Sequence, residues 1–106
     1  MPNFNDMLSK AKEMQEKMKE AQEMIKKIEV EGKSGGDLVK VVLTGNYEIK
    51  SILISDKAKK EDQEIIIDLI KAAYNNAKDN LKKKTTEEFS KLTGGLNLPP
   101  DFKVPF

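Results

Sequence analysis

The segment GGDLVKVVLTGNYEIKSILIS, residues 35–55, decides the fold of this chain. Turns at Gly35–Gly36 and Gly45–Asn46 bound two runs rich in Val, Ile and Leu, and the preceding IEVEG alternates between apolar and polar residues. Runs of this composition separated by short Gly turns are typical of antiparallel hairpins. We therefore predict a three-stranded antiparallel meander over residues 29–55.

The faces of this predicted sheet follow from the alternation of its residues. In the second strand Val39, Val41 and Leu43 share one face. The third strand has Ile or Leu at both parities, so either both of its faces are partly apolar or a bulge shifts the phase. A sheet that is apolar on both sides needs two covers. Its own helices supply cover, and a second chain is the open alternative for the rest.

The residues before the sheet predict a long helix over 4–28. Apolar residues recur there at alternating steps of three and four, with Lys, Glu and Gln at most positions between them. Asn3 or Asn5 is the expected N-cap. Glu13 with Lys17 has the i,i+4 spacing of a helix-surface ion pair. The apolar positions are Phe4, Met7, Ala11, Met14, Met18, Ala21, Ile25 and Ile28.

The residues after the sheet predict a loop, a second long helix and an apolar tail. The loop is SDKAKKED, with Asp56 or Asp62 as cap, and the helix covers 62–93. Few apolar residues continue its stripe through KKKTTEE, so the sequence is compatible with one continuous helix or with a helix broken near Thr85 and Thr86. The tail, residues 94–106, begins with two glycines and contains three prolines, so it is not helical. It is too apolar for a solvated tail, and we expect it to pack.

The order of these elements predicts a single α+β domain over residues 1–106. Because the meander stands between the helices, both helices can project from it on the same side and lie antiparallel. The thin stripe of the first helix then packs on the second helix. With 38% hydrophobic and 35% charged residues the core is thin, which favours sharing apolar surface with a partner chain.

Composition excludes several classes of function. The chain has no Cys and no His, so the usual thiol nucleophile, general base and transition-metal ligands are missing. We therefore expect no enzymatic activity, no metal and no cofactor. No apolar run exceeds three residues, far short of a membrane span or a signal-peptide core. We expect a cytoplasmic protein with no membrane partner and no small-molecule substrate.

Charge is nearly balanced overall but uneven along the chain. The net charge is +1, which argues against a dedicated nucleic-acid binder. However, residues 32–60 hold six Lys and three acidic residues, and residues 82–106 hold five Lys and three acidic residues. All nineteen basic residues are Lys.

Three groups of lysines are candidate contacts for a polyanion. The first is Lys82, Lys83 and Lys84, on one turn of the second helix. The second is Lys33, Lys40 and Lys50 on the strands, followed by Lys57, Lys59 and Lys60. The third is Lys10, Lys12, Lys17 and Lys19 on the first helix. The alternatives are a solvated helix surface for the first group, strand-edge protection for the second, and a salt-bridged helix surface for the third.

Several segments together resemble a known family. They are the first helix, the hairpin VEGKSGGDLVKV from Val30 to Val41, AAYNNA at 72–77, and the ending LPPDFKVPF from Leu98 to Phe106. Over essentially the whole chain, the sequence resembles the YbaB/EbfC family of nucleoid-associated DNA-binding proteins. The resemblance implies a tweezer-like homodimer with the sheets in the body and the long helices as arms. It also implies a bacterial protein of the nucleoid that binds duplex DNA, is linked to gene regulation, and uses no cofactor.

The resemblance transfers only the general placement of basic residues, because the family's DNA contacts are poorly defined as a pattern. One departure is the use of Lys alone, where family members commonly also use Arg. Lys suits phosphates, whereas Arg grips guanine edges. We therefore expect weakly selective, salt-sensitive DNA binding. The alternative is a protein-interaction module that uses exposed helices and the apolar tail.

Overall fold

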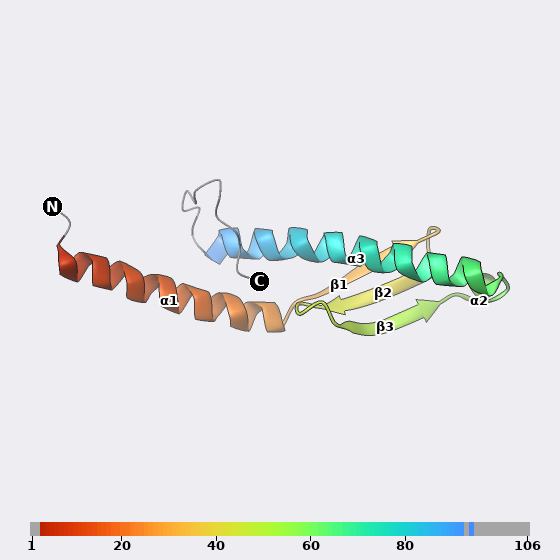
Figure 1. Cartoon of the computed structure of the whole chain (residues 1–106), viewed down its shortest axis with the longest axis horizontal. Helices are drawn as coiled ribbons and strands as arrows, with labels where there is room; N and C mark the ends of the chain where they lie inside the picture. Colours follow the sequence, from red (N-terminus) through yellow and green to blue (C-terminus); the bar gives the residue numbers. More distant parts are fainter. Residues whose placement is uncertain (1–2, 93, 95–106) are drawn as a thin grey trace.

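The structure is a computed structural model that describes residues 3–92 and Gly94. Two long helices flank a three-stranded sheet, and the molecule is elongated, 69 × 24 × 18 Å (Figure 1). The predicted α+β fold is confirmed. In chain order the elements are α1 (Phe4–Lys26), β1 (Glu29–Ser34), β2 (Val39–Thr44), β3 (Ile49–Ile54), α2 (Asp56–Lys59) and α3 (Gln63–Leu92).

The sheet is the predicted antiparallel meander, in the order β1-β2-β3. The turn between β1 and β2 uses Gly35 and Gly36 at φ +58° and +73°, a left-handed conformation that glycine adopts without strain. Between β2 and β3 the register shifts at a bulge. Val42 pairs with Ser51 and Leu43 pairs with Ile49, so the intervening Lys50 is the extra residue. The bulge brings Ile49 to the same face as Ile52 and Ile54, whereas Leu53 lies on the opposite face, so both alternatives for β3 hold in part.

Helix α3 covers one face of the sheet. Val39, Val41 and Leu43 of β2 are fully buried beneath it. On α3 every fourth residue from Ala73 is buried, which matches a helix that lies along the sheet and then continues past it. Helix α1 joins this core only at its C-terminal end, through Ile25 and the following Ile28. The buried residues of α3 are Ala73, Ala77, Leu81, Thr85 and Phe89.

Helix α3 also closes the outer edge of β1. The side-chain oxygen of Asn76 accepts a hydrogen bond from the backbone N–H of Lys33 at 2.9 Å. The side-chain amide of Asn80 donates to the carbonyl of Glu31 at 2.8 Å. These groups stand on the side of β1 that no strand pairs. Two backbone groups on the unpaired side of β1, the N–H of Lys33 and the carbonyl of Glu31, are thus satisfied from α3, while β3 forms the other edge of the sheet.

Two details of the helices differ from the sequence-based prediction. The segment expected to be a loop contains α2, whose first turn is capped by Ser55 rather than Asp56: the Ser55 hydroxyl accepts from the N–H of Ala58 at 3.1 Å. This helix is too short to show periodicity. The other difference is that α3 is unbroken at Thr85 and Thr86. Each hydroxyl donates to the carbonyl four residues earlier, so neither competes with the helix.

The two long helices run antiparallel and project beyond the same end of the sheet, as predicted (Figure 1). Their contact is shorter than the sequence suggested, because α3 ends beside the middle of α1. The Nζ of Lys17 donates to the carbonyl of Leu92, the last residue of α3, at 3.0 Å. Beyond this point the α1 stripe is exposed, with Phe4 72% and Met7 58% exposed. The prediction that residues 94–106 pack lies outside the described residues, Gly94 apart.

Candidate nucleic-acid interface

The lysine group on α3 does not form a single positive face. Successive residues of an α-helix are turned by about 100°, so three in a row spread around the axis. Leu81 and Thr85 are buried, so Lys83 points directly away from the core and Lys82 and Lys84 lie on opposite flanks. Lys84 is paired with Glu88 at 3.4 Å. Lys82 and Lys83 have no acidic partner among the described residues, so their charges are available to a ligand.

The strand group is largely neutralised within the sheet. Lys33 and Lys40 stand opposite each other in the register of β1 and β2. Lys33 pairs with Asp37 at 3.3 Å, Lys40 pairs with Glu31 at 3.8 Å, and Lys50 pairs with Glu29. Both glutamates belong to β1, the edge strand that pairs with β2. The structure therefore brings cations and acids together on this face, and its role in DNA binding stays a prediction.

The salt-bridged surface expected for α1 is not formed. Glu13 has no ion pair with Lys17, whose Nζ instead binds the carbonyl of Leu92. Lys10, Lys12 and Lys19 have no acidic partner within residues 3–92 and 94. The ion pair that α1 does contain is Lys26 with Glu23 at 3.5 Å. Exposed side chains lose conformational entropy when they form such pairs, which explains why interleaved charges stay apart.

Two further exposed or half-buried cations on α3, Lys71 and Lys78, were not among the lysines predicted from the sequence. Lys71, Lys78 and Lys82 fall on one flank of the helix, at spacings of seven and four residues, and lack acidic partners in the described part of the chain. Spacings of seven and four residues place side chains on one side of a helix, so this row could have been predicted from the sequence. We call Lys71, Lys78 and Lys82 the α3 lysine row. It runs from the sheet toward the free end of α3.

Glu88 lies near the end of α3 within reach of two lysines, Lys84 and Lys91. The positive charge of Lys91, at 3.5 Å, lowers the pKa of this carboxyl below its ordinary value, with further help from Lys84. Burial acts in the opposite direction. Glu88 therefore stays ionised and holds two lysines near the end of α3, which removes their charges from the surface available to a polyanion.

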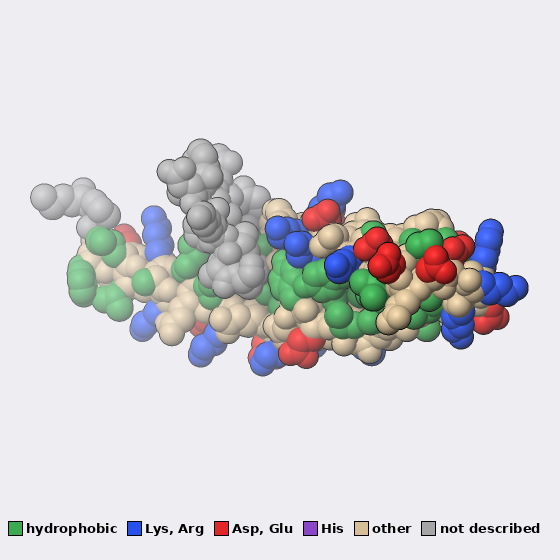
Figure 2. Space-filling view, turned by 45° about the vertical axis from the view of Figure 1, so that its right-hand side comes forward, with side chains coloured by type: hydrophobic (Ala, Val, Ile, Leu, Met, Phe, Trp, Pro, Cys, Tyr) green, Lys and Arg blue, Asp and Glu red, His purple; other side chains and the backbone are tan. Residues whose placement is uncertain are grey.

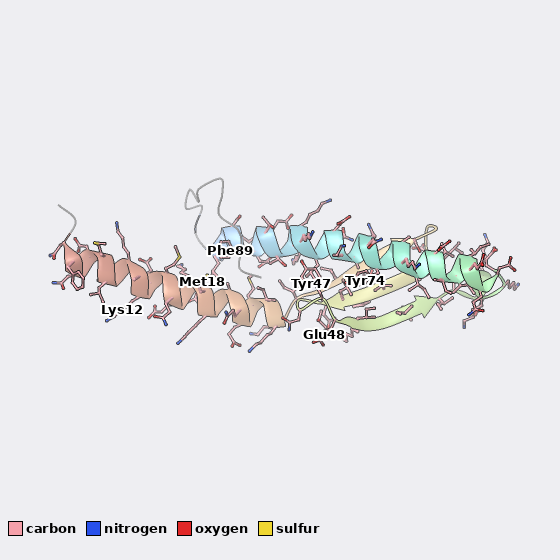
Figure 3. All side chains as sticks on the ribbon, viewed as in Figure 1. Lys12, Met18, Tyr47, Glu48, Tyr74 and Phe89 are labelled. Atoms are coloured by element: carbon pink, nitrogen blue, oxygen red, sulfur yellow. The ribbon has the colours of Figure 1, made fainter. Side chains whose placement is uncertain are left out.

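An exposed apolar surface lies beside the free edge of the sheet. Ile49 and Ile52 of β3 face the same side as α3 but are 49% and 41% exposed. Next to them, a hollow between the β2–β3 turn and α3 is lined by residues that include Tyr47, Ile70 and Tyr74. The two tyrosines lie close together in Figure 3. Figure 2 shows hydrophobic side chains forming a continuous area at the middle of the molecule.

We call this surface the β3–α3 apolar face and define it as Ile49, Ile52, Ile67, Ile70 and Tyr74. Ile67 belongs to it because it is 42% exposed and stands three residues before Ile70 on the same helix flank. Contiguous apolar surface of this kind marks an interaction site more often than scattered exposed residues do. It is therefore a candidate interface with another protein chain.

Two other kinds of site are absent from the described residues. No group of three or more acidic, His or Cys side chains is placed to hold a metal ion there. None of the described helices is both long and apolar enough to cross a bilayer.

The fold and its exposed lysines define a class of small α+β proteins with one sheet and two long helices. Comparison with known proteins identifies the family. The model of the YbaB/EbfC DNA-binding family matches residues 1–96. The chain belongs to this family, as its sequence suggested.

Two relatives match all or nearly all of the chain. A nucleoid-associated protein of Rhodospirillum centenum is 45% identical over 107 residues, which cover 100% of both chains. A nucleoid-associated protein of Hahella chejuensis is 39% identical over 104 residues, or 98% of this chain and 96% of that one. Both are bacterial.

A solved structure supports the fold. The crystal structure of an uncharacterized protein from Helicobacter pylori matches with a TM-score of 0.70 and 21% sequence identity. The match covers 87% of this chain and 98% of that chain. At this identity the likeness concerns the fold alone.

Proposed function

We propose that this protein is a homodimer that binds duplex DNA with weak sequence selectivity, through contacts between lysine ammonium groups and backbone phosphates. The observation that carries the proposal is the set of exposed lysines without acidic partners, among the described residues, on both long helices. Lys10 and Lys12 on α1 and Lys82 and Lys83 on α3 belong to this set. Membership of a DNA-binding family supports the choice of ligand.

The chemistry of the ligating residues supports weak selectivity. An ammonium group is a compact charge on a flexible stem, and it neutralises phosphates without reading base edges. Each phosphate neutralised releases condensed counterions, so affinity falls with salt at a log–log slope of about 0.9 per contact. With no Arg in the chain, the commonest bidentate contact to guanine is missing.

The edges of the sheet support a homodimer that uses β3. The outer edge of β1 is closed by Asn76 and Asn80. The edge of β3 carries no such contact within the described residues, and it adjoins the β3–α3 apolar face. A second copy applied there would bury Ile49 and Ile52 and would leave both long helices projecting from the shared body.

We place the protein in the bacterial cytoplasm at the nucleoid, with a role in nucleoid organisation or gene regulation. Relatives of near-identical length carry the name nucleoid-associated protein. We propose binding rather than catalysis as its activity.

The test is a fluorescence-anisotropy titration with two unrelated duplexes at several salt concentrations. We expect similar affinities for both duplexes and a steep loss of affinity as salt rises. The double variant Lys82→Gln/Lys83→Gln should bind both duplexes more weakly, and its salt slope should fall by about one for each phosphate that is no longer neutralised. Binding that does not depend on salt would overturn the lysine–phosphate mechanism.

The matched control is Lys40→Gln/Lys50→Gln, which removes the same charge from lysines that already have glutamate partners. We expect this variant to keep most of the affinity and the slope. If its affinity drops further than that of the α3 variant, the sheet lysines are the DNA contacts and the assignment to the helices is wrong.

A protein-interaction module remains the second candidate, and the exposed apolar residues of α1 favour it. Phe4 and Met7 are more than half exposed and lie three residues apart on one side of α1, and adjoining exposed apolar side chains mark interaction sites more often than scattered ones do. The two functions separate in the same titration: a module for protein partners shows no saturable DNA binding even at low salt.

A further inference from the structure

Helix α1 is attached to the sheet at its C-terminal end. Gly45, in the turn between β2 and β3, lies so close to this end that a Cβ atom placed on it would stand 1.9 Å from the carbonyl oxygen of Ile25. The backbone N–H of Gly45 donates to the carbonyl of Ile28 at 2.9 Å. Backbone in direct contact with backbone cannot adjust by side-chain rotation, so this end of α1 is fixed against the sheet.

A second attachment lies on the same helix at Lys17. Its ammonium group donates to the carbonyl of Leu92, the last residue of α3, at 3.0 Å, and Lys17 is half-buried. Carbonyls in the last turn of a helix have no partner within the helix and carry the negative end of its dipole, so a cation there is stabilised. Met18 and Phe89 lie on the facing sides of the two helices beside this hydrogen bond (Figure 3). Lys17 therefore ties the middle of α1 to the end of α3.

The part of α1 before Lys17 extends past both attachments. We call residues 4–16 the α1 arm. All of its residues are exposed, and the arm rises about 20 Å along the helix axis. A rotation of about 10° at its base moves its tip by roughly 3 Å, the length of one hydrogen bond. Lys10 and Lys12 lie on this arm, so their distance from a phosphate depends on how α1 is held at Lys17.

We propose that Lys17 is a positioning residue for DNA binding and is not itself a phosphate contact. By binding the carbonyl of Leu92 it fixes the direction of the α1 arm, and with it the distance from the arm's lysines to those of α3. A phosphate could take the Lys17 ammonium group only by leaving this carbonyl without its partner, which costs free energy. The inference rests on the proposed function, because it concerns how the DNA-contacting lysines are arranged.

The first test measures the direction of the arm without DNA. Because the chain has no Cys, Ser9→Cys/Glu87→Cys in the full-length chain places one nitroxide on the arm and one on α3. The labelled chain is diluted with an excess of unlabelled chain, so that pulsed electron double resonance reports distances within one chain. We expect one narrow distance distribution, which Lys17→Gln broadens or shifts. A distribution that is already broad, or that Lys17→Gln leaves unchanged, overturns the proposal.

Two further variants are the controls for the distance measurement. Lys19→Gln removes the same charge two residues along α1, from an exposed side chain with no acidic partner in the described part of the chain. Lys17→Arg keeps a cation whose N–H groups can donate to the carbonyl. Both should retain the narrow distribution. If either variant broadens it as much as Lys17→Gln does, the hydrogen bond from Lys17 does not direct the arm and the proposal is wrong.

The second test separates positioning from direct contact by a double-mutant cycle in DNA affinity. Acting through the arm, Lys17→Gln should weaken duplex binding about fivefold in the parent chain, the scale of one hydrogen bond, and should have no further effect in the Lys10→Gln/Lys12→Gln chain. An independent phosphate contact predicts the same loss in both chains, with a salt slope lower by about 0.9 in each. Equal losses in both chains, or no loss in either, contradict the positioning role.

The two tests also separate this inference from the proposed function. A parent chain that binds no duplex at low salt contradicts the proposed function. The distance measurement needs no DNA, so it still decides whether Lys17 fixes the arm.

Discussion

Gly32 of β1 packs directly against the backbone of Ala77 in α3. A Cβ atom placed on Gly32 would lie 2.1 Å from the backbone nitrogen of Ala77 and 2.2 Å from the carbonyl oxygen of Ala73. Neither atom can move without shifting the helix. This crossing brings Asn76 and Asn80 within reach of β1, so one glycine sets both the helix–sheet distance and the closure of the strand edge.

Gly32→Ala should therefore be among the most destabilising single changes in the chain. Overpacking against backbone costs more than overpacking against a flexible side chain, and we expect a loss of about 3 kcal/mol or more in the free energy of unfolding. Urea denaturation measures it. Gly36→Ala is the control, because Gly36 has open space but a positive φ, and it should cost only about 1 kcal/mol. Equal losses would show that the close approach is unimportant.

The two asparagines of α3 should respond differently to the same substitution. Asn76 accepts a hydrogen bond and Asn80 donates one. Asn76→Asp keeps the acceptor and should be nearly neutral. Asn80→Asp loses the donor and points a carboxylate at the carbonyl of Glu31, which should cost about 1 kcal/mol or more. Thermal unfolding compares the pair, and a larger loss for Asn76→Asp would contradict the assigned roles.

The β3–α3 apolar face should govern assembly. We expect light scattering to give a mass near twice the single-chain 12.0 kDa. Ile52→Lys places an ammonium group in the proposed interface, where burying it without a partner is unfavourable, and should yield monomers.

Leu53→Lys is the matched control for this change. Leu53 is the next residue along β3, is 56% exposed and points to the opposite face of the sheet. The dimer should survive this substitution. If Leu53→Lys dissociates the dimer and Ile52→Lys does not, the interface lies on the other face of the sheet and the proposed one is wrong.

Glu88 should make the free energy of unfolding decrease slightly as the pH falls into the acid range. Its pKa is lowered in the folded chain, first by Lys91 and then by Lys84, so its contribution is fully present above the unfolded-state pKa and is lost as pH falls through the lowered folded-state value. Wild type should therefore be more stable than Glu88→Gln at pH 7, and the difference should shrink as the carboxyl protonates. A difference that does not change from neutral to acid pH would contradict the ion pairs.

The sheet shows how far local pattern carries the prediction. Its turns and strands followed from the spacing of Gly and of β-branched residues, because hairpins join neighbours in the chain. The bulge in β3 was one of two alternatives that the sequence left open, and the register of the sheet decided between them. The lysine pairings did not follow. Each Lys on α1 has at least one Glu three or four residues away, and whether an exposed pair forms depends on small energies that spacing does not reveal. Lys17 instead donates a hydrogen bond to the carbonyl of Leu92, which lies 75 residues later in the chain.

The sequence by itself determined the two long helices and the three strands, their order, the α+β class and the family, because periodicity, turn residues and family motifs are properties of the chain written in order. Only the tertiary structure decided that α3 crosses β1 at Gly32, that it closes the β1 edge, and that it ends beside Lys17 so that half of the α1 stripe is uncovered. These depend on how closely two distant segments approach. That distance is set by packing across the core, which no local pattern contains.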